Sequence, residues 1–172
     1  MDESGAPAGG QPGEGREEGG AEPADFALAG FLPYRLSVAT NRISRAFARR
    51  YSQRFGLSIA EWRVLAVLGS FAPLSSNEIC ERTAMDKAKV SRAVAQLTGK
   101  GLVDRAAHPS DQRLLRLSLS PAGLATFEAV VPIARQLEAE LLDGLSPAER
   151  ALLDRCLDHL DGAVRRLEPD VT

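Results

Sequence analysis

The fold is decided by residues 75–101, SSNEICERTAMDKAKVSRAVAQLTGKG. Ser75–Glu78 matches the pattern Ser-x-x-Glu of a capping box, which predicts a short helix that runs to about residue 83. After a turn, Asp86 is suited to cap a second helix over about residues 87–100. Two helices joined by so short a turn predict a helix-turn-helix.

The residues after this segment change from helical to alternating periodicity. Leu115, Leu117 and Leu119 alternate with polar residues, which predicts a strand with one buried face. Leu102–Val103 predicts the antiparallel partner, and residues 106–111 between them are rich in turn formers and predict a loop. A helix-turn-helix followed by two strands predicts a winged helix.

Two helices are predicted before the helix-turn-helix. Residues 31–55 have apolar residues at helical spacing and end before Gly56, a natural helix stop. A capping box at Ser58–Glu61 then predicts a helix that carries Trp62 and stops near Gly69.

Two more helices are predicted after the wing, and the second has an apolar face that must be buried. Residues 121–142 predict a helix that Pro132 should kink, and a capping box at Ser146–Glu149 begins the next helix. This last helix carries one apolar stripe formed by Leu152, Leu153, Cys156, Leu157, Leu160, Val164 and Leu167. Because the stripe follows a complete domain, a partner subunit is the economical cover, which predicts a two-fold dimer.

The net charge of the 172-residue chain, -2, is the sum of three blocks of opposite sign. Residues 1–25 carry -6 and are rich in Gly and Pro, which predicts a disordered acidic tail. Residues 26–120 carry +9 and residues 121–172 carry -5. A phosphate responds mainly to charges within the screening length of about 8 Å, so the basic block predicts a nucleic-acid partner despite the total.

The helix over residues 87–100 has two distinct faces when its residues are placed about 100° apart. The face expected to pack on the core holds Val90, Ala93, Val94 and Leu97. The opposite face holds Ala88, Ser91, Arg92, Ala95 and Gln96, with Lys89 on its flank. Small side chains let a helix approach the major groove closely, while Arg and Gln reach base edges. An ordinary solvated helix face is the alternative, and the preceding helix and turn favour DNA.

A second candidate DNA contact lies at the tip of the predicted wing. Asp111 and Arg113 are two residues apart, so on a strand both side chains point to the same side. An Arg at a hairpin tip can insert into the narrow minor groove, with Asp111 holding its guanidinium in place. A surface ion pair that contributes little is the alternative on these residues alone.

The run at residues 111–123, DQRLLRLSLSPAG, resembles the wing signature of the MarR family of bacterial transcription regulators. That signature is Asp-x-Arg, five residues, Leu-Thr and then a Gly, and Ser120 here keeps the hydroxyl of the usual Thr. Residues 61–65 resemble the family's second helix, and residues 81–92 resemble its path into the recognition helix. The likeness extends over about residues 28–168.

The resemblance implies a mainly helical fold with a small β-wing, in which a homodimer binds a pseudo-palindromic operator, usually to repress. Residues 58–120 would form the winged helix-turn-helix domain that binds double-stranded DNA. Residues 26–57 would supply the first dimerisation helix and a ligand cleft, and residues 121–172 the other dimerisation helices. The N–H groups at the helix start near Ser75 suit a phosphate. The candidate DNA contacts are then Ser75, Ser76, Asn77, Lys87, Lys89, Ser91, Arg92, Gln96, Asp111 and Arg113.

In the resembling family, a cleft between the dimer helices and the DNA-binding domain often takes phenolic or aromatic acids. The candidates for it here are Phe31, Tyr34, Arg35, Ser37, Val38 and Trp62. Apolar rings with one Arg suit an aromatic carboxylate or its CoA thioester. Plain core or dimer packing is the alternative for Phe31 and Trp62.

Other classes of protein are disfavoured by what the sequence lacks. Two cysteines and two histidines, none at metal-ligand spacing, predict no metal and no disulfide framework, and Cys80 and Cys156 are expected to be buried. No apolar run reaches about 18 residues and no secretory signal begins the chain, which predicts a cytoplasmic protein without a membrane span. An enzyme is least favoured and no cofactor is expected, because no nucleophile–base set or phosphate loop is found. The other alternative is a winged helix that only binds a protein or dimerises, without an operator.

Overall fold

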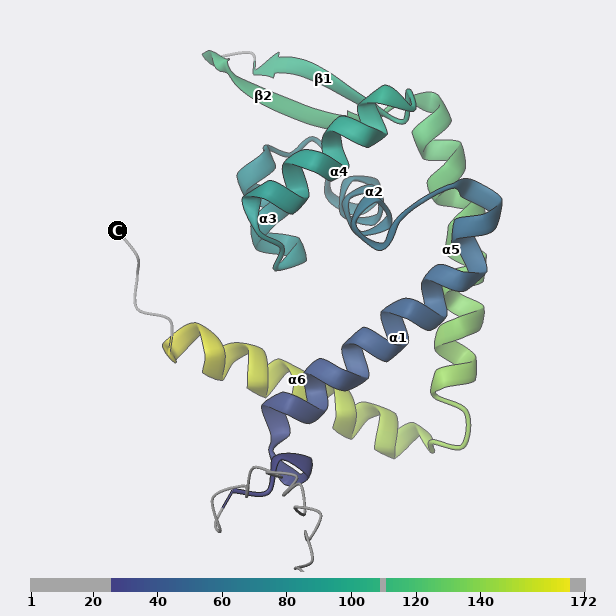
Figure 1. The fold of residues 1–172 in the computed structure, drawn as a ribbon, viewed down its shortest axis with the longest axis vertical. Helices are drawn as coiled ribbons and strands as arrows, with labels where there is room; N and C mark the ends of the chain where they lie inside the picture. Colours follow the sequence, from purple (N-terminus) through teal and green to yellow (C-terminus); the bar gives the residue numbers. More distant parts are fainter. Residues whose placement is uncertain (1–25, 109–110, 168–172) are drawn as a thin grey trace, which may run out of the picture. The chain divides into compact units, whose positions relative to one another are not determined.

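The computed structural model describes residues 26–108 and 111–167, with side chains at all of them except residues 108 and 111–114. The predicted acidic tail at residues 1–25 lies outside this range. In chain order the elements are η1 (Leu28–Gly30), α1 (Leu32–Phe55), α2 (Ile59–Phe71), α3 (Ser76–Thr83), α4 (Lys87–Gly99), β1 (Val103–His108), β2 (Asp111–Leu119), α5 (Pro121–Leu141) and α6 (Pro147–Leu167) (Figure 1). The predicted fold class, mainly helical with a small two-stranded wing, is confirmed.

The chain divides into two units at a point within α1, after Thr40. The described part of the first unit holds η1 and the first turns of α1, where the rings of Phe26 and Phe31 lie 5.1 Å apart. The rest of α1, the other α-helices and both strands belong to the second unit. None of the helices in the described parts of the chain is long and apolar enough to cross a membrane.

The helix starts agree with the local sequence signals. The Ser58 and Ser75 side chains accept hydrogen bonds from the backbone N–H groups of Glu61 and Glu78, and the carboxylates of both glutamates accept the serine N–H in return. The same exchange joins Ser146 and Glu149 before α6. These bonds satisfy N–H groups that a helix start otherwise leaves without partners.

The predicted end of α2 near Gly69 is wrong, since the helix continues to Phe71. A Cβ atom at Gly69 would lie 2.8 Å from the ring carbons of Phe127 on α5. This glycine therefore serves close packing between two helices and does not end the helix.

The wing is longer than the sequence predicts. Residues 106–108 were expected to be loop, but they continue β1, because Ala106 and Ala107 pair with Arg116 and Leu115 of β2. Pairing with the neighbouring strand outweighs the weak strand preference of alanine. Residues 109–110, in the remainder of the expected loop, lie outside the described residues.

A further main-chain contact ties the wing to the helix-turn-helix. On the edge of β2 away from β1, Leu74 N–H donates to the Leu117 carbonyl at 3.1 Å, and Leu117 N–H donates to the Leu74 carbonyl at 2.8 Å. Because Leu74 lies just before α3, these bonds hold the start of that helix against the wing.

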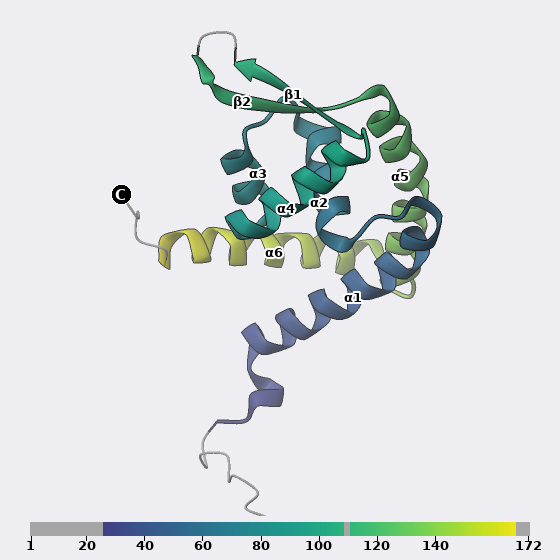
Figure 2. The same ribbon diagram turned by 45° about the horizontal axis from the view of Figure 1, so that its top comes forward.

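The hydrophobic core lies among α2, α3, α4 and the base of the hairpin, and Tyr51 of α1 and Val130 of α5 are also buried in it. Figure 2 shows the two strands running side by side along this group of helices. The fully buried members of the core include Leu57, Val64, Leu65, Leu68, Ile79, Val90, Leu97, Val103 and Leu117. The start of α5 closes against it so tightly that a Cβ at Gly123 would lie 1.9 Å from the Leu102 carbonyl oxygen.

The apolar stripe of α6 is exposed to solvent in the single chain. No residue of α6 is buried, and Leu152, Leu157 and Val164 keep about half of their surface, at 52%, 48% and 49%. The expectation that both cysteines are buried is wrong for Cys156, which is exposed, while Cys80 is half-buried. Cys156 is exposed because it shares the stripe, which no other described part of the chain covers.

Candidate nucleic-acid interface

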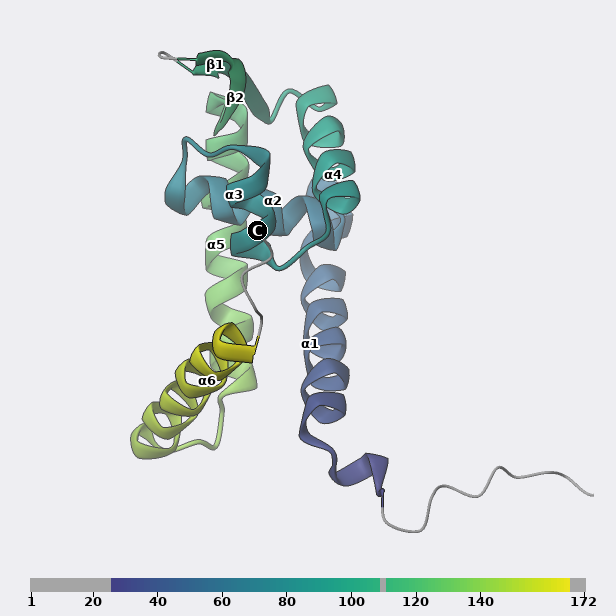
Figure 3. The same ribbon diagram turned by 90° about the vertical axis from the view of Figure 1, so that its left-hand side faces the viewer.

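Helix α4 presents the face that the sequence predicts for DNA. Val90, Ala93, Val94 and Leu97 are all buried against the core, as predicted. The exposed residues of the helix are Lys87, Ala88, Lys89, Ser91, Arg92, Ala95, Gln96 and Gly99. Figure 3 shows α2 and α3 on one side of α4 and the other side open. Because the buried face is so regular, α4 cannot rotate without exposing apolar surface, and this fixes the direction of its polar side chains.

Lys89 lies beside Asp86, the residue that caps α4. Asp86 caps the helix, and its carboxylate accepts the backbone N–H of Lys89 at 2.7 Å and lies 3.1 Å from the Lys89 ammonium. The backbone hydrogen bond, followed by the side-chain bond, lowers the pKa of Asp86. Asp86 is therefore ionised at neutral pH and lies beside the Lys89 ammonium in a pair that stays exposed to solvent.

The start of α3 holds the candidates Ser75, Ser76 and Asn77. Ser76 and Asn77 are exposed, whereas Ser75 is half-buried and uses both its hydroxyl and its N–H in the capping box with Glu78. The carboxylate of Glu78 already occupies the N–H of Ser75. A phosphate at this helix start would therefore meet the N–H groups of Ser76 and Asn77.

An ion pair that sequence reasoning missed joins α3 to the wing. Arg116 of β2 donates to Glu78 at 2.6 Å. The hydrogen bonds from Ser75, with the Arg116 guanidinium adding to them, lower the pKa of Glu78. Only the alternation of β2, which puts Arg116 on the face opposite Leu115 and Leu117, pointed to it.

The wing-tip candidates Asp111 and Arg113 belong to β2 by their backbone, and Asp111 pairs with His108 beyond a shift in register. Their side chains lie outside the described residues, so the minor-groove contact stays a prediction. Arg105 of β1, which pairs with Leu117 of β2, is an exposed cation of the wing. Arg105 was not among the residues predicted from the sequence, because residues 106–111 were expected to be loop and β1 to be short.

The end of α4 is held by an ion pair whose carboxylate is buried. The Lys100 ammonium donates to Glu61 at 2.5 Å and to the Gly56 carbonyl at 2.7 Å, and Glu61 is only 6% exposed. Burial alone raises the pKa of Glu61, but the hydrogen bonds from Lys100 and Ser58 outweigh it and lower the pKa. This pair ties the C-terminal end of α4 to the N-terminal end of α2.

A cationic pocket lies between α1, α2 and the start of α4, and sequence reasoning did not find it. Its volume is about 310 Å³, and its lining residues are Asn41, Ser44, Arg45, Ile59, Ala60, Arg63, Ala84, Met85 and Lys89. Arg63 donates to the Ser44 hydroxyl at 3.1 Å, which fixes its guanidinium across the gap between α2 and α1. An anion is the natural occupant of such a site.

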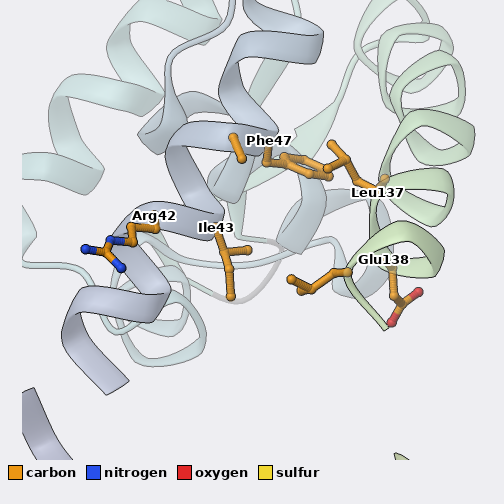
Figure 4. A pocket seen from close by; sticks show the side chains of 8 residues that line it. Arg42, Ile43, Phe47, Leu137 and Glu138 are labelled. Atoms are coloured by element: carbon orange, nitrogen blue, oxygen red, sulfur yellow. The ribbon is translucent and has the colours of Figure 1, made fainter. Parts of the chain in front are cut away.

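An apolar groove of about 390 Å³ lies between α1 and α5. Phe47 and Leu137 point toward each other from the two helices, and Ile43 lines the groove beside them (Figure 4). Its lining residues are Arg42, Ile43, Ala46, Phe47, Ala134, Leu137, Glu138 and Leu141. Next to it, Arg50 binds Glu140 through two hydrogen bonds of 3.2 and 2.7 Å.

Comparison with known proteins agrees with this arrangement. The model of the MarR family matches residues 55–114, which hold the helix-turn-helix and most of the wing. A MarR family transcriptional regulator from Silicibacter pomeroyi DSS-3 has a solved structure that is 32% identical, with a TM-score of 0.66, covering 79% of this chain and 99% of that one. The chain belongs to the MarR family.

Two other relatives add information about this MarR-family regulator. The HTH-type transcriptional repressor IacR of Pseudomonas putida is 28% identical over 134 residues, which are 78% of this chain and 80% of IacR. BpsR of Bordetella bronchiseptica, whose DNA binding is regulated by 6-hydroxynicotinic acid, is 26% identical with a TM-score of 0.71. The match covers 79% of this chain and 96% of BpsR. The relatives are regulators of transcription, as the sequence predicts for this chain.

The predicted ligand residues of this MarR-family chain fall in both units. Phe31, Tyr34, Arg35 and Ser37 are exposed and Val38 is half-buried, all on or just before the first turns of α1. Trp62 lies on α2 in the second unit, half-buried, where its ring stacks on Phe127 at 6.3 Å and packs against Phe47 and Tyr51. Trp62 is thus part of an aromatic cluster, and a ligand cleft formed with the α1 residues stays a prediction.

Proposed function

We propose that this chain is a homodimeric repressor that binds a pseudo-palindromic operator and is released from it by an aromatic acid or an aromatic acyl-CoA. The exposed face of α4 carries the proposal. There, Arg92 and Gln96 are placed to reach base edges, while Ala88 and Ala95 leave room for the major groove. Lys87 and Lys89 at the helix start are suited to phosphates, which position the helix on the duplex.

The contact to the minor groove is proposed for the wing. Arg113 would insert there, supported by Asp111. The ion pair between Glu78 and Arg116 and the main-chain bonds of Leu74 support this role, because they fix the wing relative to the helix-turn-helix. Helix α4 and the wing would therefore contact DNA from fixed relative positions.

The proposed dimer would use residues 26–57 and 121–172. Support comes from the exposed stripe of α6 and from the groove between α1 and α5, where Ile43 and Leu141 remain 43% and 54% exposed. Burying a leucine side chain fully contributes about 1.5–3 kcal/mol, so covering the stripe is strongly favourable. A two-fold dimer would place two winged helices on the two halves of an operator.

The proposed effector is an aromatic carboxylate. The cationic pocket supports this, since its volume is at the lower end of the range for small-molecule sites and it offers two guanidinium groups. The relative BpsR responds to such an acid. A CoA thioester would need further cations for its phosphates, and the arginines of α1 are the candidates for these. We place the regulator in the cytoplasm with the DNA that it would bind.

The test is an electrophoretic mobility shift with the DNA upstream of the chain's own gene. The proposal expects a sequence-specific shift that an aromatic carboxylate or its CoA ester reverses. Arg113→Ala should weaken this shift in a salt-matched titration while the dimer stays intact. A chain that shows no sequence-specific shift, with or without ligands, would instead be a winged helix that binds proteins or only dimerises.

A further inference from the structure

The cationic pocket and the exposed face of α4 share one residue, Lys89. Its side chain is 61% exposed on the flank of α4, where it is suited to a DNA phosphate. The same side chain lines the pocket together with Arg45 of α1 and Arg63 of α2. The two functions proposed above therefore meet at a single ammonium group.

The charges around the pocket leave room for an anion. Its lining holds three cations from three helices, and no Asp or Glu lies among the described residues that line it. Asp86 partners the ammonium of Lys89 at 3.1 Å, but it caps α4 and does not line the pocket. Arg63 uses one hydrogen bond on Ser44, and its guanidinium has five N–H donors, so donors remain for a carboxylate.

We propose that an aromatic carboxylate bound in the cationic pocket takes Lys89 as a ligand and withdraws it from the DNA phosphate. This inference rests on the proposed function and adds a mechanism to it: effector and operator compete for one side chain. Lys89 has a flexible stem and a compact charge, so it can turn from the helix flank toward the pocket without movement of α4.

The competition has two quantitative consequences. By thermodynamic linkage, operator DNA must weaken carboxylate binding by the same factor by which the carboxylate weakens operator binding. A bound carboxylate should also lower the salt dependence of operator binding, by about one unit of slope for each lysine withdrawn from a phosphate.

The experiment compares Lys89→Met with Lys87→Met in the full-length chain. Both variants lose one charge from the exposed start of α4, and only Lys89 lines the pocket. Operator affinity is measured by fluorescence anisotropy at several salt concentrations, with and without benzoate or 6-hydroxynicotinate. Carboxylate affinity is measured separately by calorimetry in the absence of DNA.

Both variants should bind the operator more weakly and with a smaller salt slope. Lys89→Met should also bind the carboxylate about tenfold more weakly, the loss expected for one charge-assisted hydrogen bond. At saturating carboxylate its operator affinity should no longer fall, whereas Lys87→Met should be released by the wild-type factor.

The inference is overturned if Lys89→Met, saturated with carboxylate, still releases the operator by the wild-type factor. It is also overturned if neither carboxylate binds the wild-type chain at millimolar concentration. In both cases a sequence-specific shift by the wild-type chain would leave operator binding intact. The absence of that shift is the separate result that removes the proposed function itself.

Discussion

Arg116 of the wing and Glu78 of α3 form an ion pair of 2.6 Å, through the carboxylate oxygen that also accepts the Ser75 N–H at 2.7 Å. One carboxylate therefore caps the first helix of the helix-turn-helix and holds the second strand of the wing. With the main-chain bonds between Leu74 and Leu117, it fixes the wing against the start of α3.

Arg116→Met should clearly lower the affinity for the operator while changing the free energy of unfolding only slightly. The pair is partly exposed, with side-chain exposures of 29% and 41%, so its effect on thermal stability should be small. Operator affinity should fall because the wing loses its fixed position. Glu78→Gln should act through the same contact, so the double variant should bind no more weakly than the weaker single variant. Additive losses would show that the two residues act independently.

Lys100→Met should lower the free energy of unfolding by about 1–2 kcal/mol at neutral pH, because it leaves the Glu61 carboxylate buried without its cation. The pKa of Glu61 is lowered from 4.5 in the wild-type fold, so the stabilisation is complete above that pH and is lost as the pH falls through the folded pKa. The difference between the two proteins should therefore shrink in acid. Urea unfolding at neutral and acidic pH measures it, and a difference that does not depend on pH would contradict the assignment.

Tyr51→Phe should leave the fold as stable as before or slightly more stable, by up to about 1 kcal/mol. The Tyr51 hydroxyl is fully buried and has no hydrogen-bond partner among the described residues, and burial raises its pKa to about 12. Removing the hydroxyl relieves the desolvation and keeps the ring contacts with Phe47 and Trp62. Denaturant unfolding gives the answer, with Tyr34→Phe on the exposed part of α1 as the control. A clear loss of stability would mean that the hydroxyl has a partner.

Gly123→Ala should destabilise the fold by about 1–3 kcal/mol or more, because the new Cβ would lie 1.9 Å from the Leu102 carbonyl oxygen. Gly99→Ala is the matched control, since no atom lies within 4 Å of its Cβ position and the residue is helical. It should stabilise the chain by up to about 1 kcal/mol. The thermal unfolding temperatures of the two variants should move in opposite directions, and equal shifts would contradict the close packing of α5 against Leu102.

Leu157→Glu should convert the proposed dimer into monomers. The substitution puts a charge in the middle of the α6 stripe, where a partner chain would otherwise bury an apolar side chain. Asp158→Ala, on another face of α6, is the control and should remain dimeric. Light scattering after size exclusion gives the mass, and operator affinity should fall with it. A Leu157→Glu chain with the mass of the wild-type assembly would exclude α6 from the interface.

Much of this fold could be predicted because its signals are local. The capping boxes at Ser58 and Ser75 depend on hydrogen bonds between residues three apart, so the sequence contains both partners. The buried and exposed faces of α4 follow from helical periodicity alone. The prediction was wrong at Gly69 and at residues 106–108, where Phe127 on α5 or the strand β2 decides what the local residues do.

By itself, the sequence determined where most helices begin, which face of α4 is buried, and the family. Only the tertiary structure decided which distant charges meet: Lys100 with Glu61, 39 residues apart, and Arg116 with Glu78, 38 residues apart. It also assembled the cationic pocket from three helices and placed Lys89 both at this pocket and on the exposed flank of α4. The physical reason is that hydrogen-bonded caps and helical periods act over a few residues, whereas ion pairs and pockets depend on how whole helices pack.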